Sequence, residues 1–202
     1  LGPNNSGGTL EATTGEQQEA GLKYLNDAGD LSVTAAYYYI EETNRVVSGP
    51  GEIRDQVGAK SEGWEVELKK QIGGLELLAS YSDFRVVNDQ TGERLPYLAD
   101  KLASAWAKYE LENGLRFGAG VRYVGDNVGY DYGTGAGPNV PAVTLYDAML
   151  GYAVNQWDFS MNVQNLTDEE YVSWCRGQAG PNVYDCGYGE TRTVTANARY
   201  RF

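Results

Sequence analysis

Two cysteines, Cys175 and Cys186, carry the most reactive side chains of this sequence, and they lie in one polar stretch. They enclose ten residues, among them Gly177, Gly180 and Pro181. In an exported protein such a pair indicates a disulfide, which in the chain-entropy model would stabilise the enclosed loop by about 3 kcal/mol. A metal-binding pair is the alternative, although no further ligands are evident. The sequence contains no histidine, which excludes Ser-His-Asp and Cys-His catalysis and His-ligated metals.

Acidic side chains stand close together in two places. Glu65 and Glu67 alternate with apolar residues, and Asp168, Glu169 and Glu170 are consecutive. Such groups can perform acid–base chemistry or bind metal ions. Charges that face a polar interior or lie in a solvated loop explain both groups better. We therefore expect a protein without enzymatic activity, without a metal site and without a resident cofactor.

Aromatic residues concentrate in two polar connections of the chain. Tyr130 and Tyr132 lie in the first, and Trp174, Tyr184 and Tyr188 lie in the second. Aromatic loop side chains recognise ligands with little loss of rotamer entropy. They also hold long loops together, so both roles stay open for each residue. These five residues are candidates for ligand contact.

The elements that must position these residues are β-strands. The last ten residues, Thr193 to Phe202, alternate between apolar and polar side chains without a break. The same period of two recurs along the chain, which predicts an all-β protein of about nine strands and no helix. We expect the strands at residues 19–24, 31–40, 58–70, 75–81, 102–111, 115–123, 144–153, 157–164 and 193–202.

The connections between these strands alternate strictly in length. Tight turns follow the first, third, fifth and seventh strands, and long connections lie at about 41–57, 84–100, 125–141 and 167–192. Outer-membrane barrels impose this alternation, because their turns are short on one side and their loops are long on the other. Charged residues within strands would then face a polar lumen, while the opposite face meets lipid. The pattern predicts an antiparallel transmembrane β-barrel segment, and a soluble β-sandwich is the alternative.

The composition agrees with a barrel and limits the partners. The chain has 16 tyrosines and 26 glycines but only 4 phenylalanines, which is typical of turns and amphipathic aromatic residues. Its net charge of −12 argues against a nucleic-acid partner, which would require a basic face. Aromatic residues near the strand ends are expected at the membrane interfaces, namely Tyr24, Tyr123, Tyr146, Tyr152, Trp157 and Tyr200.

The odd number of strands has a topological consequence. If the C-terminus lies on the short-turn side, the first of nine strands starts on the long-loop side. Single-chain bacterial barrels normally have an even number of strands and both termini on the periplasmic side. We therefore expect that at least one strand precedes Leu1 and that the closing strand pairs with it.

Several stretches of the chain together resemble a known family. They are TGEQQEAGLKY at 14–24, GWEVEL at 63–68, VQNLTDEEYV at 163–172, Cys175 with Cys186, GETRTVTA at 189–196, and YRF at 200–202. In the same order, such stretches resemble the C-terminal part of TonB-dependent siderophore receptors, and the ferrichrome and ferrioxamine type is the most similar.

The resemblance implies a 22-stranded barrel in the outer membrane of a Gram-negative bacterium, in which residues 1–202 would form the last nine strands. A plug domain and the motif that engages TonB would lie outside this sequence. A ferric siderophore, of the hydroxamate type, would bind at the outer mouth as the transported ligand. Outer-membrane lipid, lipopolysaccharide and the barrel-assembly machinery would be further partners.

The resemblance also bears on single residues. In the family the corresponding loop is closed by a cysteine pair, and an aromatic residue often follows the first cysteine near the ligand. Here that place is Arg176, which is a candidate for attracting an anionic siderophore instead. Phe202 is expected to act as the C-terminal aromatic signal for assembly. The alternative function is a structural or adhesive barrel domain whose loops bind surfaces or proteins, and a plug domain and TonB motif upstream of Leu1 would decide against it.

Overall fold

The structure is a computed structural model that describes residues 9–48, 54–131, 137–177 and 183–202. No helix in these ranges is long and apolar enough to cross a membrane. The regular elements of the described ranges are strands: β1 (Thr14–Leu25), β2 (Leu31–Ser48), β3 (Arg54–Ile72), β4 (Leu75–Asn88), β5 (Lys101–Glu110), β6 (Leu115–Val124), β7 (Asn127–Val128), β8 (Asn139–Val140), β9 (Val143–Val154), β10 (Trp157–Gln164), β11 (Val172–Gly177), β12 (Tyr184–Tyr188) and β13 (Thr193–Tyr200).

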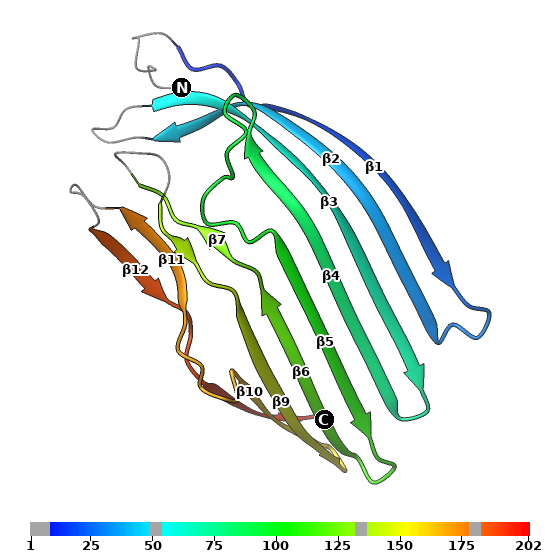
Figure 1. Cartoon of the computed structure of the whole chain (residues 1–202). Helices are drawn as coiled ribbons and strands as arrows, with labels where there is room; N and C mark the ends of the chain where they lie inside the picture. Colours follow the sequence, from blue (N-terminus) through cyan, green and yellow to red (C-terminus); the bar gives the residue numbers. More distant parts are fainter. Residues whose placement is uncertain (1–8, 49–53, 132–136, 178–182) are drawn as a thin grey trace.

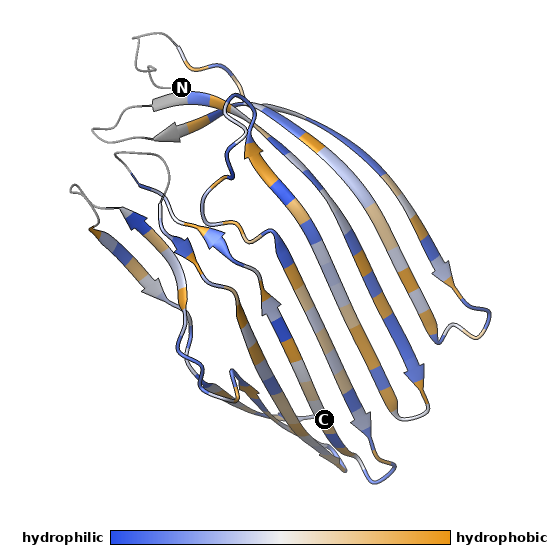
Figure 2. Cartoon of the chain, in the orientation of Figure 1, coloured by the Kyte–Doolittle hydropathy of each residue, from blue (hydrophilic) through white to orange (hydrophobic). Residues whose placement is uncertain are grey.

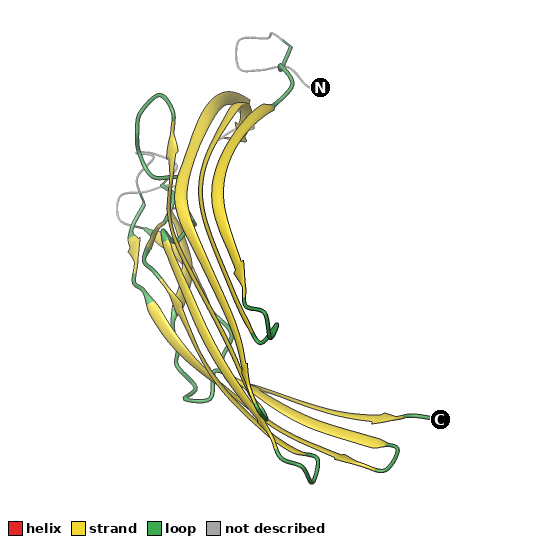
Figure 3. Cartoon of the chain, turned by 90° about the vertical axis from the view of Figure 1, so that its right-hand side faces the viewer, coloured by secondary structure: helices red, strands yellow, loops and turns green. Residues whose placement is uncertain are grey.

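Nine of these strands form one antiparallel sheet in the order β1-β2-β3-β4-β5-β6-β9-β10-β13. Each of these nine strands pairs with the next of the nine along the chain. In the described part of the chain, β1 and β13 are the two edges of the sheet. The sheet is strongly curved, so it has one concave and one convex face (Figures 1 and 3). The prediction of nine barrel strands is confirmed. The four short strands β7, β8, β11 and β12 lie outside the sheet, within the third and fourth long connections.

The four short turns gather at one end of the sheet and the long connections at the other (Figure 1). Each short turn has one residue with positive φ, namely Gly29, Gly73, Gly114 or Asn155. Glycine adopts this left-handed conformation freely and asparagine tolerates it, which lets the chain reverse within a few residues. The chain enters β1 at the end of the long connections and leaves β13 at the end of the turns.

Apolar side chains form a continuous band across the sheet, because the register places them opposite one another. One row of register pairs consists of Tyr24, Val33, Leu68, Ala79, Ala105, Val121 and Tyr146. The ribbon accordingly alternates in hydropathy along most strands (Figure 2). Large apolar residues of this band are exposed, with Leu22 at 82% and Trp64 at 58%. The fully buried apolar residues of the described ranges are few: Leu10, Ala59, Val140, Leu145 and Cys175. A band of this kind without a packed core fits lipid and not a soluble sandwich.

The opposite face of the sheet is polar. It carries ion pairs between strands, such as Arg116 with Asp158 at 2.8 Å. A hollow of about 500 Å³ on this side is lined mainly by polar residues, including Lys23, Thr34, Glu67, Lys69, Ser80 and Ser104. In a curved sheet whose apolar band meets lipid, the polar face is the concave one, because the concave face of a barrel wall lines its interior. The charged residues at alternate positions of β3 thus face a wet interior, as the sequence predicts.

The tall hairpin of β2 and β3 corrects the sequence-based boundaries. The sequence predicts the first long connection at 41–57, yet β2 continues to Ser48 and β3 begins at Arg54. The apolar band ends where Tyr37 packs on Trp64, with ring centroids 4.7 Å apart. Beyond this level polar residues occupy the convex face as well, and Glu41 pairs with Lys60 at 3.6 Å. Strands that stand in water on both faces need no apolar alternation, so the pattern could not show them. For the same reason β4 extends to Asn88.

Candidate functional site

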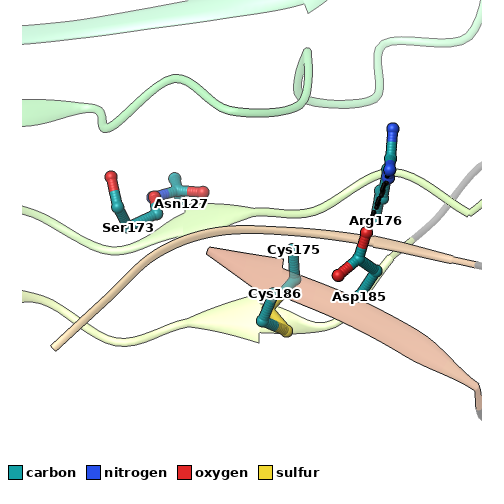
Figure 4. Close-up of a disulfide and its surroundings, with 6 residues drawn as sticks. All are labelled: Asn127, Ser173, Cys175, Arg176, Asp185 and Cys186. Carbon is teal, nitrogen blue, oxygen red and sulfur yellow. Dashed lines mark hydrogen bonds and ion pairs between the residues drawn. A yellow bond between two sulfur atoms is a disulfide. The ribbon is translucent and has the colours of Figure 1, made fainter. Parts of the chain in front are cut away.

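The fourth long connection forms a hairpin closed by a disulfide (Figure 4). Its strands β11 and β12 pair so that Cys175 and Cys186 stand opposite each other, and the two residues form the predicted disulfide. Cys175 is 5% exposed. The covalent bond and the strand pairing together fix the shape of this hairpin.

The hairpin separates the predicted ligand residues onto two faces. The register places Trp174 and Arg176 on one face with Asp185, whereas Tyr184 and Tyr188 alternate with them and share the face of the disulfide. Arg176 donates hydrogen bonds from Nε and Nη2 to Oδ2 of Asp185 at 3.2 and 2.9 Å. Its guanidinium carbon lies 5.6 Å from the ring centre of Trp174. The charge of Arg176 is therefore paired within the hairpin, and the predicted residues of the hairpin lie on both of its faces.

The third connection joins the edge of this hairpin through main-chain hydrogen bonds. The N–H of Tyr130 donates to the carbonyl of Cys175 at 3.2 Å, and the N–H of Gly177 donates to the carbonyl of Tyr130 at 2.5 Å. The side-chain amide of Asn127 donates to the carbonyl of Ser173 at 3.5 Å (Figure 4). Tyr130 is thus beside Arg176, as its bridge partner. Tyr132 lies outside the described residues.

The second connection is attached to the third in a similar way. The N–H of Tyr97 donates to the carbonyl of Val128 at 2.8 Å. Tyr97 has a φ of 67°, which is rare for a residue with a bulky side chain. Arg94 forms an ion pair with Asp126 at 3.1 Å. The second, third and fourth connections therefore form one hydrogen-bonded unit, which we call the loop body (residues 89–100, 125–131, 137–142, 165–177 and 183–192).

The connections that form the loop body are acidic. They contain three arginines, Arg94, Arg176 and Arg192, and ten carboxylates: Asp89, Glu93, Asp100, Asp126, Asp131, Asp168, Glu169, Glu170, Asp185 and Glu190. Each arginine forms an ion pair with a carboxylate, Arg94 with Asp126, Arg176 with Asp185 and Arg192 with Asp168. This end of the sheet consequently presents a negative field to an approaching ligand.

The acidic clusters noted in the sequence serve different purposes. Glu65 and Glu67 lie on the concave face of β3, and Asp168 binds Arg192 at the base of the fourth connection. In the described ranges no three or more Cys, Asp or Glu side chains are placed to hold a metal ion. Phe202 lies at the short-turn end, where its ring meets Tyr200 edge-on at 5.2 Å. Its role as an assembly signal stays a prediction.

Sequence reasoning missed one residue of this region, Asn165, which is 2% exposed at the base of the fourth connection. Its side chain binds the main chain at both ends of that connection. The signals in the sequence are an asparagine directly after a strand, which many turns share, and its place in the stretch VQNLTDEEYV that carries the family resemblance. The joining of the loops was missed as well, because it uses main-chain atoms of Tyr130, Cys175 and Gly177 that any sequence possesses.

Known proteins share this architecture. A family model described as TonB dependent receptor-like, beta-barrel matches residues 1–166. The chain is 29% identical to the ferrioxamine B receptor of Salmonella typhimurium over 98% of this chain and 30% of that protein. It is 31% identical to the ferrichrome outer membrane transporter/phage receptor of Escherichia coli, over 97% of this chain and 27% of the other. Among solved structures, the ferric-catecholate import receptor Fiu of Escherichia coli matches 96% of this chain and 28% of its own with a TM-score of 0.75 and 25% identity. The chain spans less than a third of each of these proteins.

Proposed function

This chain belongs to the TonB-dependent receptor β-barrel family, and we propose that the protein takes up a ferric siderophore of the hydroxamate type with energy delivered through TonB. The family places the chain in the outer membrane of a Gram-negative bacterium. Two similar proteins are named for ferrioxamine B and ferrichrome. In this proposal the convex face meets lipid, the concave face lines the transport path, and the loop body forms part of the outer mouth.

The charge of the loop body is the observation that carries the choice of ligand class. Three singly charged hydroxamates neutralise a ferric ion, whereas three doubly charged catecholates leave a triply negative complex. The excess of carboxylates at the mouth repels the second complex and is indifferent to the first. The three arginines offset only part of this charge, because each pairs with one of the ten carboxylates, and seven of the ten remain in excess. The aromatic candidates Tyr130, Trp174, Tyr184 and Tyr188 suit a neutral, partly apolar ligand.

A ferric catecholate is the second candidate, and the structural match to the receptor Fiu is the observation that favours it. A direct comparison separates the two classes. The intact receptor, purified from outer membranes, would be titrated with ferrichrome, which is a neutral tris-hydroxamate complex, with a ferric tris-catecholate and with cobalamin. We expect the hydroxamate complex to bind at least ~10-fold more tightly than the catecholate, which corresponds to roughly 1.4 kcal/mol.

The outcomes discriminate between the alternatives. Tighter binding of the catecholate would overturn the hydroxamate assignment but leave the receptor function intact. No binding of any of the three ligands, together with the lack of a plug domain and a TonB motif in the full reading frame, would favour the adhesive or structural barrel.

A further inference from the structure

Asn165 connects the two ends of the fourth long connection. It directly follows β10, and its side-chain amide donates to the carbonyl of Glu169 at 2.8 Å and to the carbonyl of Glu190 at 3.2 Å. Its side-chain oxygen accepts a hydrogen bond from the N–H of Glu169 at 2.8 Å. Glu169 and Glu190 stand at opposite ends of the connection, so one buried amide binds both.

Other contacts join the same two ends. The carboxylate of Asp168 accepts a hydrogen bond from the N–H of Arg192 at 2.8 Å, and the N–H of Gly189 donates to the carbonyl of Tyr171 at 2.9 Å. The disulfide hairpin rises from this base. Any change at the base must therefore alter the position of the hairpin as a whole.

A chain of side chains continues from this base to the concave wall of the barrel. The N–H of Asn165 donates to Oδ1 of Asp147 at 2.9 Å. Arg122 holds the same carboxylate with two hydrogen bonds, from Nε at 2.5 Å and from Nη2 at 3.0 Å. The side chain of Asp147 is 14% exposed, whereas that of Arg122 is 42% exposed. These hydrogen bonds thus link β6, β9 and the end of β10 to the base of the fourth connection.

We propose that Asn165 is a positioning residue that, together with Asp147, fixes the loop body on the mouth of the barrel. Asn165 holds the fourth connection directly. It holds the third connection indirectly, because that connection pairs with Cys175 and Gly177 through Tyr130. The effect of Asn165 on ligand affinity rests on the proposed function, whereas its effect on the loops does not.

A purely local role for Asn165 makes different predictions. If it only satisfied its own turn, its loss would loosen residues next to it and leave the third connection unchanged. If it only stabilised the barrel, its loss would weaken the whole sheet. Positioning predicts a change in both connections of the loop body while the sheet is unaffected.

The experiment compares two asparagines with the same backbone conformation in the intact receptor. Asn165 has a φ of 50° and Asn155, in the short turn at the other end of β9 and β10, has a φ of 53°. Glycine at either position removes the side chain without backbone strain. Hydrogen exchange would be followed in residues 125–131, in residues 166–177 and in the sheet, alongside the dissociation rate of ferrichrome.

For Asn165→Gly we expect exchange to accelerate at least ~10-fold in both connections, since several buried hydrogen bonds are lost. Dissociation of the ligand should accelerate as well, while exchange in β1 to β5 stays as in the wild type. Asn155→Gly should change neither readout. Asn165→Asp keeps the acceptor for the N–H of Glu169 and should give an intermediate effect.

Acceleration confined to residues 166–171, or spread over the whole sheet, would overturn the proposal. If Asn165→Gly does not assemble, Asp147→Asn weakens the same chain of contacts and must produce the same pattern of exchange. If the exchange pattern is as expected but wild-type protein binds no ferric siderophore, the proposed function fails and the positioning role stands.

Discussion

Arg176 forms an ion pair with Asp185, and this pair determines whether the disulfide hairpin offers a positive charge to an anionic ligand. Replacing Asp185 with asparagine frees the guanidinium beside Trp174. We expect Asp185→Asn to raise the affinity for a ferric tris-catecholate by at most roughly 5-fold, because exposed charge pairs are worth about 1 kcal/mol or less. Affinity for the neutral tris-hydroxamate should not change. Equilibrium binding by tryptophan fluorescence measures both.

Asp126→Asn is the matched control for this prediction. It also removes an exposed carboxylate that pairs with an arginine, Arg94, but it lies in the third connection and not in the disulfide hairpin or its base. An equal gain in catecholate affinity in both variants would show that only the total charge of the loop body matters and would contradict a specific role for Arg176.

Asp30, in the first short turn, gives a pH dependence. Its carboxylate accepts a hydrogen bond from Nζ of Lys70 at 2.7 Å and one from Asn26 at 2.5 Å, and these contacts lower its pKa from the ordinary value of an aspartate. A carboxyl whose pKa is lower in the folded state stabilises the fold above its unfolded pKa, and that stability is lost as the pH falls through the folded pKa.

Lys70→Gln should therefore lower the Tm at neutral pH, and the difference from wild type should disappear at pH values below the lowered pKa of Asp30. Thermal unfolding of both proteins across the acid range tests this. A difference in Tm that persists unchanged in strong acid would show that Lys70 acts through packing and not through Asp30.

At the scale of single residues, the sequence predicted only those roles that follow from the residue type alone. Two cysteines in one polar connection predicted the disulfide correctly, because the sequence holds two cysteines and they allow one pairing within the chain. Asn165 could not be recognised, because its importance lies in the convergence of Glu169, Glu190 and Asp147 around it. Only the folded base of the loop brings these groups together.

At the scale of the strands, β5 and β6 pack together because an aromatic ring of β5 lies on two glycines of β6. The ring of Trp106 lies against Gly118 and Gly120, where a methyl group would collide with it. Gly120→Ala should therefore force the ring to move and destabilise the barrel by about 1–3 kcal/mol. The temperature at which the folded barrel loses its altered mobility on denaturing gels measures this loss.

Two further variants make the test specific. Gly15→Ala is the control, since a methyl group there meets nothing nearer than the carbonyl of Glu41 at 3.6 Å. In a protein that already carries Trp106→Ala, the ring is absent. Adding Gly120→Ala to that protein should therefore cost less stability than it costs in the wild type. If both glycine variants are equally destabilised, the cause is the glycine backbone and not the ring.

Strand positions were predictable where one face meets lipid, and less so elsewhere. The alternation located β10 at its observed limits, because Trp157, Phe159, Met161 and Val163 all belong to the apolar band. It missed the outer half of the hairpin of β2 and β3, where water surrounds both faces. It also missed β11 and β12, which are short and hold their shape through the disulfide and main-chain bonds.

At the scale of the whole molecule, the two faces of the sheet must tolerate charge differently. Ala105 is the central residue of β5 in the apolar band, between Ala79 and Val121, whereas Ser104, beside it on the same strand, faces the concave side. Ala105→Arg should cost about 2–4 kcal/mol, as expected for arginine facing the middle of the bilayer, and Ser104→Arg should cost far less. The fraction of receptor assembled in outer membranes reports both. Equal assembly of the two variants would contradict the assigned lipid face.

The architecture as a whole was predictable because strand order follows chain order and connection lengths alternate. The loop body was not, since the second, third and fourth connections meet only after the strands have placed their ends at one mouth. No pattern in residues 89–100 reports that Tyr97 will bind Val128. The part of the protein closest to its proposed ligand is thus the part that required a structure.

The disulfide also has a consequence for the order of events during biogenesis. Cys175 and Cys186 are 11 residues apart, so their bond needs no distant part of the chain to form. It can close in the oxidising periplasm before β13 pairs with β10. The fourth connection would then travel to the cell surface as a doubled segment, two strands wide. The gap through which the nascent barrel admits its loops must accommodate that width, or oxidation must wait until the hairpin has crossed.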